Sequence, residues 1–466
     1  MKKIEIEKKY LLLALIFGVI FVFIIPPFQA PDEDSHFKKA YQVSIGEFYP
    51  KVKNNTIGNY FPKEMLMYIN DKLGYIGDRD RKYTYSSLVS DQYTKMNYDD
   101  KSFNNYSTAT ITPIAYVVPA LGIVFSKMCA RIFGLEAINT AYMLYFARFF
   151  SLLFSIFLLY MSIKITPVFK RTFSIVCLNP MTLFLCSVIS YDNLLISLTT
   201  LALAIILKII YDNKLKEIPK RYIITLTLIG IVLLSVKVIY FFMYILLFLI
   251  PIEKFGDKKR KLKLALVMIG IILFFTVLFK LPNILCKVTP SGGNLTSKQI
   301  HFILTNPIKF LSILFNNILD QRFFQLSSMV GIFGLIDTYN PFVIICLTYI
   351  WAILVALSDG ICEKIQIKPI FKIFIILYSL FIIFAVYSAM YISWTPKISG
   401  NKIGTSYISG VQGRYFIPII IPVLLLFSNK KIKKYRIMEI IRDNYLISFV
   451  AILVISTISI ILRYWV

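Results

Sequence analysis

Three consecutive acids and a histidine follow the first apolar stretch of this chain. They are Asp32, Glu33, Asp34 and His36, and three prolines lie among the residues just before them. Proline suits the first turn of a helix but not its interior, so the pattern predicts that one helix ends here and another begins with the acids. Asp32 and His36, four residues apart, would share one face of that second helix. An acid held there could act as a general base on a hydroxyl group.

The same residues have simpler interpretations. Acids in the first turn of a helix stabilise it by about 0.3 to 1 kcal/mol each, and Asp32 and Glu33 fit that role. His36 could orient the acids, bind a ligand or lie at the surface. The sequence leaves these alternatives open.

The composition is that of an α-helical membrane protein. Of the 466 residues 57% are hydrophobic, in continuous runs rather than the alternating segments of a membrane barrel. The net charge of +26 comes from short Lys/Arg clusters between apolar runs. Such clusters act as topology signals and not as a nucleic-acid surface, and the positive-inside rule places them, with the N-terminus, in the cytoplasm.

About eleven crossings are expected, some of them short. They cover residues 11–25, 141–163, 173–189, 194–207, 222–236, 238–251, 264–281, 342–357, 371–392, 415–427 and 445–462. The largest outer segments are a first polar loop (28–140) and a second polar loop (282–341). Segment 111–133 is apolar enough to cross, but a crossing there would move later basic clusters outside, so it is predicted to lie on the outer surface as juxtamembrane helices.

Charged residues also interrupt the apolar runs. A charged side chain at the centre of a membrane helix costs roughly 2.5 to 3.5 kcal/mol on insertion scales, so Arg148, Asp192 and Lys237 should face a cavity or a partner. Asp192 could begin a helix or serve as a second acid of a site. Lys237 and Arg414 suit an anionic phosphate, or could pair with acids. The pair of short crossings around Lys237 is expected to turn there.

The chain resembles domain-of-unknown-function family 2142 of bacterial membrane proteins. The resemblance covers nearly the whole chain through PFQAPDE (27–33) followed by His36 and Ala40, SYD (190–192), KVIY (237–240), GIFGLID (331–337) and GVQGRYFIP (410–418). In the fourth motif Leu335 stands where a tryptophan is expected.

That family is similar to the GT-C glycosyltransferases, which take sugars from polyprenyl-phosphate carriers on the outer side of the membrane. The resemblance implies a single GT-C-like transmembrane domain, a catalytic acid in the first polar loop, hence Asp32 or Glu33, and surface helices after it. The residues expected to bind substrate or phosphate are His36, Asp192, Lys237, Tyr240, Gln412, Arg414 and Tyr415. A divalent Mg²⁺ or Mn²⁺ ion held by Asp32, Glu33 and Asp192 is an optional addition.

The function predicted from these observations is an inverting glycosyltransferase of the bacterial plasma membrane. It would move a sugar from a polyprenyl-phosphate donor to an extracytoplasmic glycan or lipid acceptor, with Asp32 as the base. The alternatives are a transporter, flippase or polymerase of lipid-linked glycans, which have no need of an acid poised on a hydroxyl group.

Overall fold

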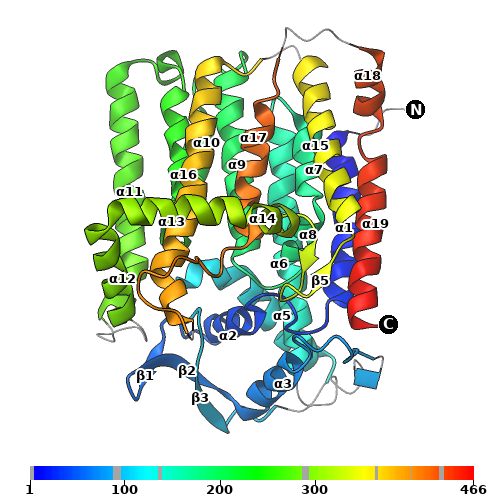
Figure 1. Cartoon of the computed structure of the whole chain (residues 1–466), viewed down its shortest axis with the longest axis vertical. Coiled ribbons are helices and arrows are strands. Elements are labelled where there is room, and N and C mark those ends of the chain that lie inside the picture. Colours follow the sequence, from blue (N-terminus) through cyan, green and yellow to red (C-terminus); the bar gives the residue numbers. More distant parts are fainter. Residues whose placement is uncertain are drawn as a thin grey trace.

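The computed structural model describes residues 5–84, 86–87, 96–134, 139–285, 293–362, 366–398, 400–429 and 435–466. Upright helices form a bundle, and a smaller assembly that contains the strands β1–β3 covers one end of it, called here the sheet end (Figure 1). The upright helices are α1 (Ile6–Ile24), α6 (Thr140–Ile165), α7 (Lys170–Cys177), α9 (Asp192–Tyr211), α10 (Lys220–Val236), α11 (Lys258–Leu285), α15 (Phe342–Cys362), α16 (Pro369–Ser393), α17 (Ile417–Leu425) and α19 (Ile447–Tyr464).

The remaining helices are shorter or lie outside the upright set. They are α2 (Glu33–Ser44), α3 (Lys63–Leu73), α5 (Val117–Ile132), α8 (Pro180–Cys186), α12 (Gly293–Thr305), α13 (Pro307–Asp320), α14 (Arg322–Ser328), α18 (Arg436–Asp443) and the 3-10 helices Pro113–Tyr116 (η1), Val238–Leu249 (η2), Ile252–Phe255 (η3), Thr395–Lys397 (η4) and Gly413–Phe416 (η5).

Seven of the described helices are long and apolar enough to cross a membrane, and there is an eighth if the bent α12–α13 pair counts as one span. The chain is therefore an α-helical, multispanning membrane protein. Six of the seven coincide with predicted crossings, namely α6, α9, α11, α15, α16 and α19. The seventh, Pro113–Ile132, is the segment that the sequence analysis places on the outer surface.

The packing of α5 bears on that segment. Gly122 lies against the backbone of Phe146 and Ala147, and Phe125 contacts the rings of Phe146 and Phe150. A short connection joins the two helices, so α5 runs back antiparallel to α6. Because α5 is the shorter helix, it covers only the first half of α6. It shares a hydrophobic core with α2, α3 and β2 that is separate from the core of the bundle. This packing favours the surface interpretation, which stays a prediction.

Two other predicted crossings are interrupted. Instead of one crossing over 173–189, the structure has α7 and α8, because Pro180 cannot continue a helix and begins the next one at its first turn. At Lys237 the chain turns as expected. The residue is extended (φ −151°), and the η2 helix then runs back along α10, with the Tyr244 hydroxyl donating to the Leu226 carbonyl.

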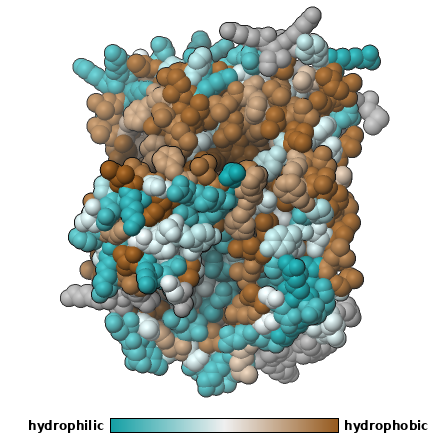
Figure 2. Space-filling view, in the orientation of Figure 1, coloured by the Kyte–Doolittle hydropathy of each residue, from teal (hydrophilic) through white to brown (hydrophobic). Residues whose placement is uncertain are grey.

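The sheet end is built from the first polar loop. Strands β1 (Lys51–Lys53), β2 (Thr56–Pro62) and β3 (Lys101–Asn105) form an antiparallel sheet in that order. Figure 2 shows, on the face in view, an apolar belt across the upper part of the molecule and a mainly hydrophilic surface at the sheet end. The transverse helix α13 lies between the two (Figure 1). It exposes large apolar side chains at Ile308, Leu311, Phe315 and Leu319.

Candidate active site

The proline-rich turn positions the three acids as predicted. Helix α1 ends at Ile24 and α2 begins at Glu33, with Asp32 as the residue before its first turn. Asp32 has a left-handed backbone (φ +57°), which is uncommon for a residue other than glycine and is tolerated best by Asp and Asn. The His36 amide donates to the Asp32 carbonyl at 3.0 Å, so the two residues are one turn apart. The Asp32 side chain is 56% exposed.

Glu33 points the other way and is fully buried. Its Oε1 accepts hydrogen bonds from Arg148 Nε (2.7 Å) and the Ile189 amide (3.1 Å), and its Oε2 from Arg148 Nη2 (2.6 Å) and the Phe28 amide (3.1 Å). A carboxylate with four donors and no exposure cannot reach a substrate hydroxyl. The prediction that Glu33 could be the base does not fit this geometry, and Glu33 is better described as the ion-pair partner of Arg148.

Arg414 joins the two other acids. It belongs to the short η5 helix, which begins after the extended residue Gln412, and it is 7% exposed. Its Nη2 lies 3.5 Å from Asp32 Oδ2, and its Nε lies 3.2 Å from Asp192 Oδ2. Nε has no hydrogen bond of good geometry within the described residues. Asp192, the first residue of α9, thus directs its carboxylate towards Arg414 and contributes to the site.

Lys237 also lies beside Tyr415. Its buried Nζ is 3.9 Å from the centre of the Tyr415 ring, with the Tyr240 and Tyr191 rings at 5.6 and 5.8 Å. Cation–π contacts of this kind stabilise an ammonium by about 0.5 to 2 kcal/mol. Nζ has no hydrogen-bond partner among the residues described. The three tyrosines therefore hold a cation that keeps its N–H donors available.

Two further predicted residues, His36 and Tyr240, contact the tyrosines of this cluster. His36 Nδ1 lies 2.8 Å from the Tyr116 hydroxyl, and its ring packs edge-on against Tyr191 at 5.0 Å. Burial lowers the pKa of His36 below its usual range, which favours a neutral imidazole. The Tyr240 hydroxyl donates to the Tyr415 carbonyl at 2.9 Å and so fixes the backbone next to Arg414.

A narrow pocket opens beside Arg414. Its lining includes Pro31, Gln412 and Arg414 together with the apolar residues Phe184, Ile332 and Ile336. Gln412 is thus placed at the pocket, as predicted, while Phe184 and Ile336 add apolar walls. All five motif segments, far apart in the chain, contribute residues to this cluster or its pocket.

The optional metal site does not fit the donor set. Glu33, one of its three proposed ligands, is fully engaged by Arg148, and Arg414 lies between the other two, Asp32 and Asp192. No group of three or more His, Cys, Asp or Glu side chains in the described part of the chain is placed to hold an ion. Arg414 supplies positive charge at the position a cation would take.

Sequence reasoning missed Tyr116 and Tyr191, which contact His36 and Lys237. Tyr116 lies in the segment assigned to the outer surface, where tyrosine has no distinctive pattern. Tyr191 stands within the SYD motif and could have been found there. Arg463, directly after the last predicted crossing, was also missed.

The arrangement of the five motifs agrees with a family comparison. A family model described as "Predicted membrane protein (DUF2142)" matches residues 15–426. The chain belongs to this DUF2142 family. The match begins within α1 and ends just after α17, so it includes every residue of the cluster around Arg414. No curated protein and no solved structure matches this DUF2142 protein significantly.

Proposed function

We propose that this DUF2142 protein is an inverting membrane glycosyltransferase with a GT-C-like fold of about eleven crossings. The donor would be a sugar on a polyprenyl phosphate, and the acceptor a glycan or lipid of the bacterial cell envelope. The observation that carries the proposal is the grouping of two buried cations with an accessible acid: Arg414 lies 3.5 Å from the half-exposed Asp32, and Lys237 Nζ lies over the ring of the adjacent Tyr415.

The acid is suited to accept a proton. Asp32 would take the proton of an acceptor hydroxyl, and the hydroxyl oxygen would form a bond to the anomeric carbon of the sugar. The bond between that carbon and the phosphate oxygen would break, with its electron pair leaving on the phosphate. A positioned base of this kind contributes roughly 100- to 10,000-fold to a rate.

The cations are suited to the leaving phosphate. An arginine fork can grip two phosphate oxygens, and a lysine provides a compact charge. Both are already buried, so they act in a region of low dielectric, where donors aimed at developing charge are most effective. Lys237 Nζ has no hydrogen-bond partner among the described residues, and Arg414 makes only long contacts to its two acids, which supports an anion bound between the two cations.

The apolar surroundings support a lipid-linked donor. The pocket beside Arg414 has walls from α8 and from the second polar loop, and the exposed apolar side of α13 lies next to the apolar belt (Figure 2). Under the positive-inside rule the basic clusters are cytoplasmic, which would put the sheet end and the site on the extracytoplasmic side.

A flippase or transporter of lipid-linked glycans would also need buried cations in an apolar cavity. It would not need a base, so the two functions differ in their dependence on Asp32. A polymerase of lipid-linked glycans also transfers a sugar to a hydroxyl group, so its activity would depend on Asp32 as well.

The test compares Asp32→Asn with Asp34→Asn in a deletion strain. Asp34 is in the same turn, but its carboxylate pairs with Lys38 at 3.1 Å. Surface glycans and lipid-linked sugars of each strain are measured by mass spectrometry, with protein levels checked in the membrane fraction. Asp32→Asn should leave the surface glycan unmodified and let the lipid-linked donor accumulate, while Asp34→Asn restores the wild-type glycan. Wild-type glycan from Asp32→Asn would exclude the base and favour the transporter.

A further inference from the structure

One wall of the pocket beside Arg414 comes from a hairpin of the second polar loop. Strands β4 (Ile332–Phe333) and β5 (Thr338–Tyr339) pair antiparallel, which leaves residues 334–337 as the turn. Gly334 and Ile336 of this turn line the pocket, and the Phe333 ring packs on Phe184 of α8 at 5.3 Å. The GIFGLID motif therefore contributes uncharged residues to the lining of the pocket.

The turn has an unfavourable backbone. Gly334 and Ile336 both have positive φ, +60° and +64°. Glycine adopts this region freely, but a β-branched residue such as isoleucine is a genuine outlier there. A side chain at position 334 would also collide with Asp337 and Tyr464. Such a conformation persists only where the surrounding structure holds it.

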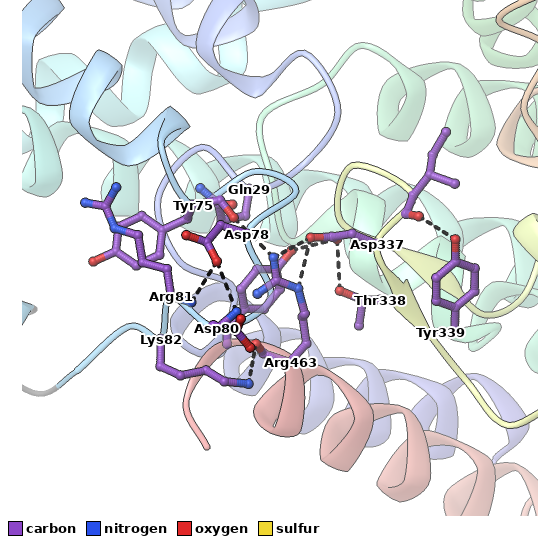
Figure 3. Close-up of polar contacts among 12 residues, drawn as sticks. Gln29, Tyr75, Asp78, Asp80, Arg81, Lys82, Asp337, Thr338, Tyr339 and Arg463 are labelled. Carbon is purple, nitrogen blue, oxygen red and sulfur yellow. Dashed lines mark hydrogen bonds and ion pairs between the residues drawn. The ribbon is translucent and has the colours of Figure 1, made fainter.

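The end of α19 is what holds the turn. Asp337 Oδ2 accepts hydrogen bonds from Arg463 Nε (3.0 Å) and Nη2 (2.7 Å), and its Oδ1 accepts from the Tyr464 hydroxyl (3.3 Å). The Arg463 and Asp337 side chains are only 5% and 11% exposed. Figure 3 shows Arg463 reaching from α19 to Asp337, with Tyr75 and Lys82 of the first polar loop beside it.

The same helix end is fixed to the rest of the sheet end. Lys82 Nζ donates to the carbonyls of Leu462 and Arg463 at 2.9 and 3.2 Å. The Trp465 indole donates to the Ile24 carbonyl, at the end of α1, at 2.8 Å. The end of α19 is thus held by the first polar loop, which also carries Asp32.

We propose that Arg463 is a positioning residue for the site, which holds the 334–337 turn so that Ile336 keeps its place in the lining of the pocket beside Arg414. Ile336 would then limit the size of the donor group next to its phosphate. The role of Ile336 rests on the proposed function, whereas the role of Arg463 in holding the turn does not.

The test uses the full-length protein in lipid nanodiscs with the variants Arg463→Gln, Arg463→Lys and Arg171→Gln. Arg171→Gln is the matched control, because it breaks a similarly buried pair, with Asp359 at 3.4 Å, that involves neither the turn nor the pocket. Two readouts are recorded for each variant: hydrogen exchange of the peptide covering 331–341, and binding of farnesyl phosphate as a short polyprenyl phosphate.

Arg463→Gln should raise exchange in 331–341 by about tenfold, as expected when a local contact that holds a segment is lost, and should weaken farnesyl phosphate binding by about fivefold. Arg463→Lys should recover part of both, and the control should change neither. If Arg463→Gln is poorly folded, Tyr464→Phe removes one hydrogen bond to Asp337 and should give a smaller change in the same peptide.

Unchanged exchange in 331–341 in Arg463→Gln would overturn the proposal, as would raised exchange with unaltered binding. A wild-type protein that fails to bind farnesyl phosphate would instead contradict the proposed function, and the exchange result would still decide whether Arg463 holds the turn.

Discussion

Two buried arginines meet neighbouring acids of the same motif, and their environments differ sharply. All five N–H donors of Arg148 are used, in hydrogen bonds of 2.6 to 3.1 Å to Glu33 and to the carbonyls of Val22, Ile25 and Pro26. Arg414 instead has long contacts of 3.2 and 3.5 Å to Asp192 and Asp32.

The difference separates structure from function within one motif. Arg148 and Glu33 join α6 to the end of α1 and to the start of α2, and nothing further can bind to them. Lys237 Nζ has no hydrogen-bond partner in the described part of the protein, and Arg414 Nε lies 3.2 Å from Asp192 without a hydrogen bond of good geometry. Buried polar groups are nearly always satisfied in proteins, so a group that is not satisfied is the better candidate for binding a ligand.

The comparison is tested most strongly by making the same substitution at both arginines. Arg148→Met leaves Glu33 buried without its partner, and breaking such a pair costs about 3 to 5 kcal/mol. Arg414→Met should cost less than half as much, because its acids are partly exposed or weakly bonded. Thermal unfolding in detergent measures both. Equal unfolding temperatures for the two variants would show that the arginines do not differ.

Ligand binding should give the opposite order. Arg414→Met and Lys237→Met should each weaken farnesyl phosphate binding by about tenfold or more, which corresponds to the 1.5 to 3 kcal/mol of a hydrogen bond to a charged group. Lys38→Met is the control, because Lys38 is bound to Asp34 at 3.1 Å and does not contact Arg414. Isothermal titration in nanodiscs provides the affinities. Equal affinity in all three variants would place the phosphate elsewhere.

The smallest effect concerns pH. Burial lowers the pKa of His36 below the ordinary histidine value of about 6.5, so the unfolded chain binds a proton more readily than the folded protein does. Stability should therefore fall as the pH drops through 6.5, by at most about 1.4 kcal/mol per pH unit. His36→Gln should unfold with a weaker dependence between pH 7.5 and 5.5. A parallel dependence in both proteins would assign it to other groups.

Much of the fold followed from apolar length and charge. The long helices α6, α9, α11, α15, α16 and α19 agree with predicted crossings, because each needs only a continuous apolar run. The break between α7 and α8 was missed, although Pro180 marks it, because the apolar run continues through it. Segment 113–132 shows the limit of such reasoning, since its length permits a crossing while its partners favour the surface.

The sequence predicted most residues of the candidate site, but it did not predict the role of each residue. The motifs identified Asp32, Asp192, Lys237 and Arg414, and the structure brings them together. Sequence could not tell which of Asp32 and Glu33 stays accessible, because that depends on Arg148, more than one hundred positions away. Arg463 could not be found either, since its partner Asp337 becomes a neighbour only when α19 packs beside the second polar loop.

The most direct measurement is an electron cryomicroscopy structure of the protein in nanodiscs with a bound polyprenyl phosphate. The phosphate should lie within hydrogen-bonding distance of both Lys237 Nζ and the Arg414 guanidinium, with the Asp32 carboxylate facing it from the extracytoplasmic side. A phosphate bound away from both cations, or a site that opens to the cytoplasm, would contradict the proposed transfer reaction.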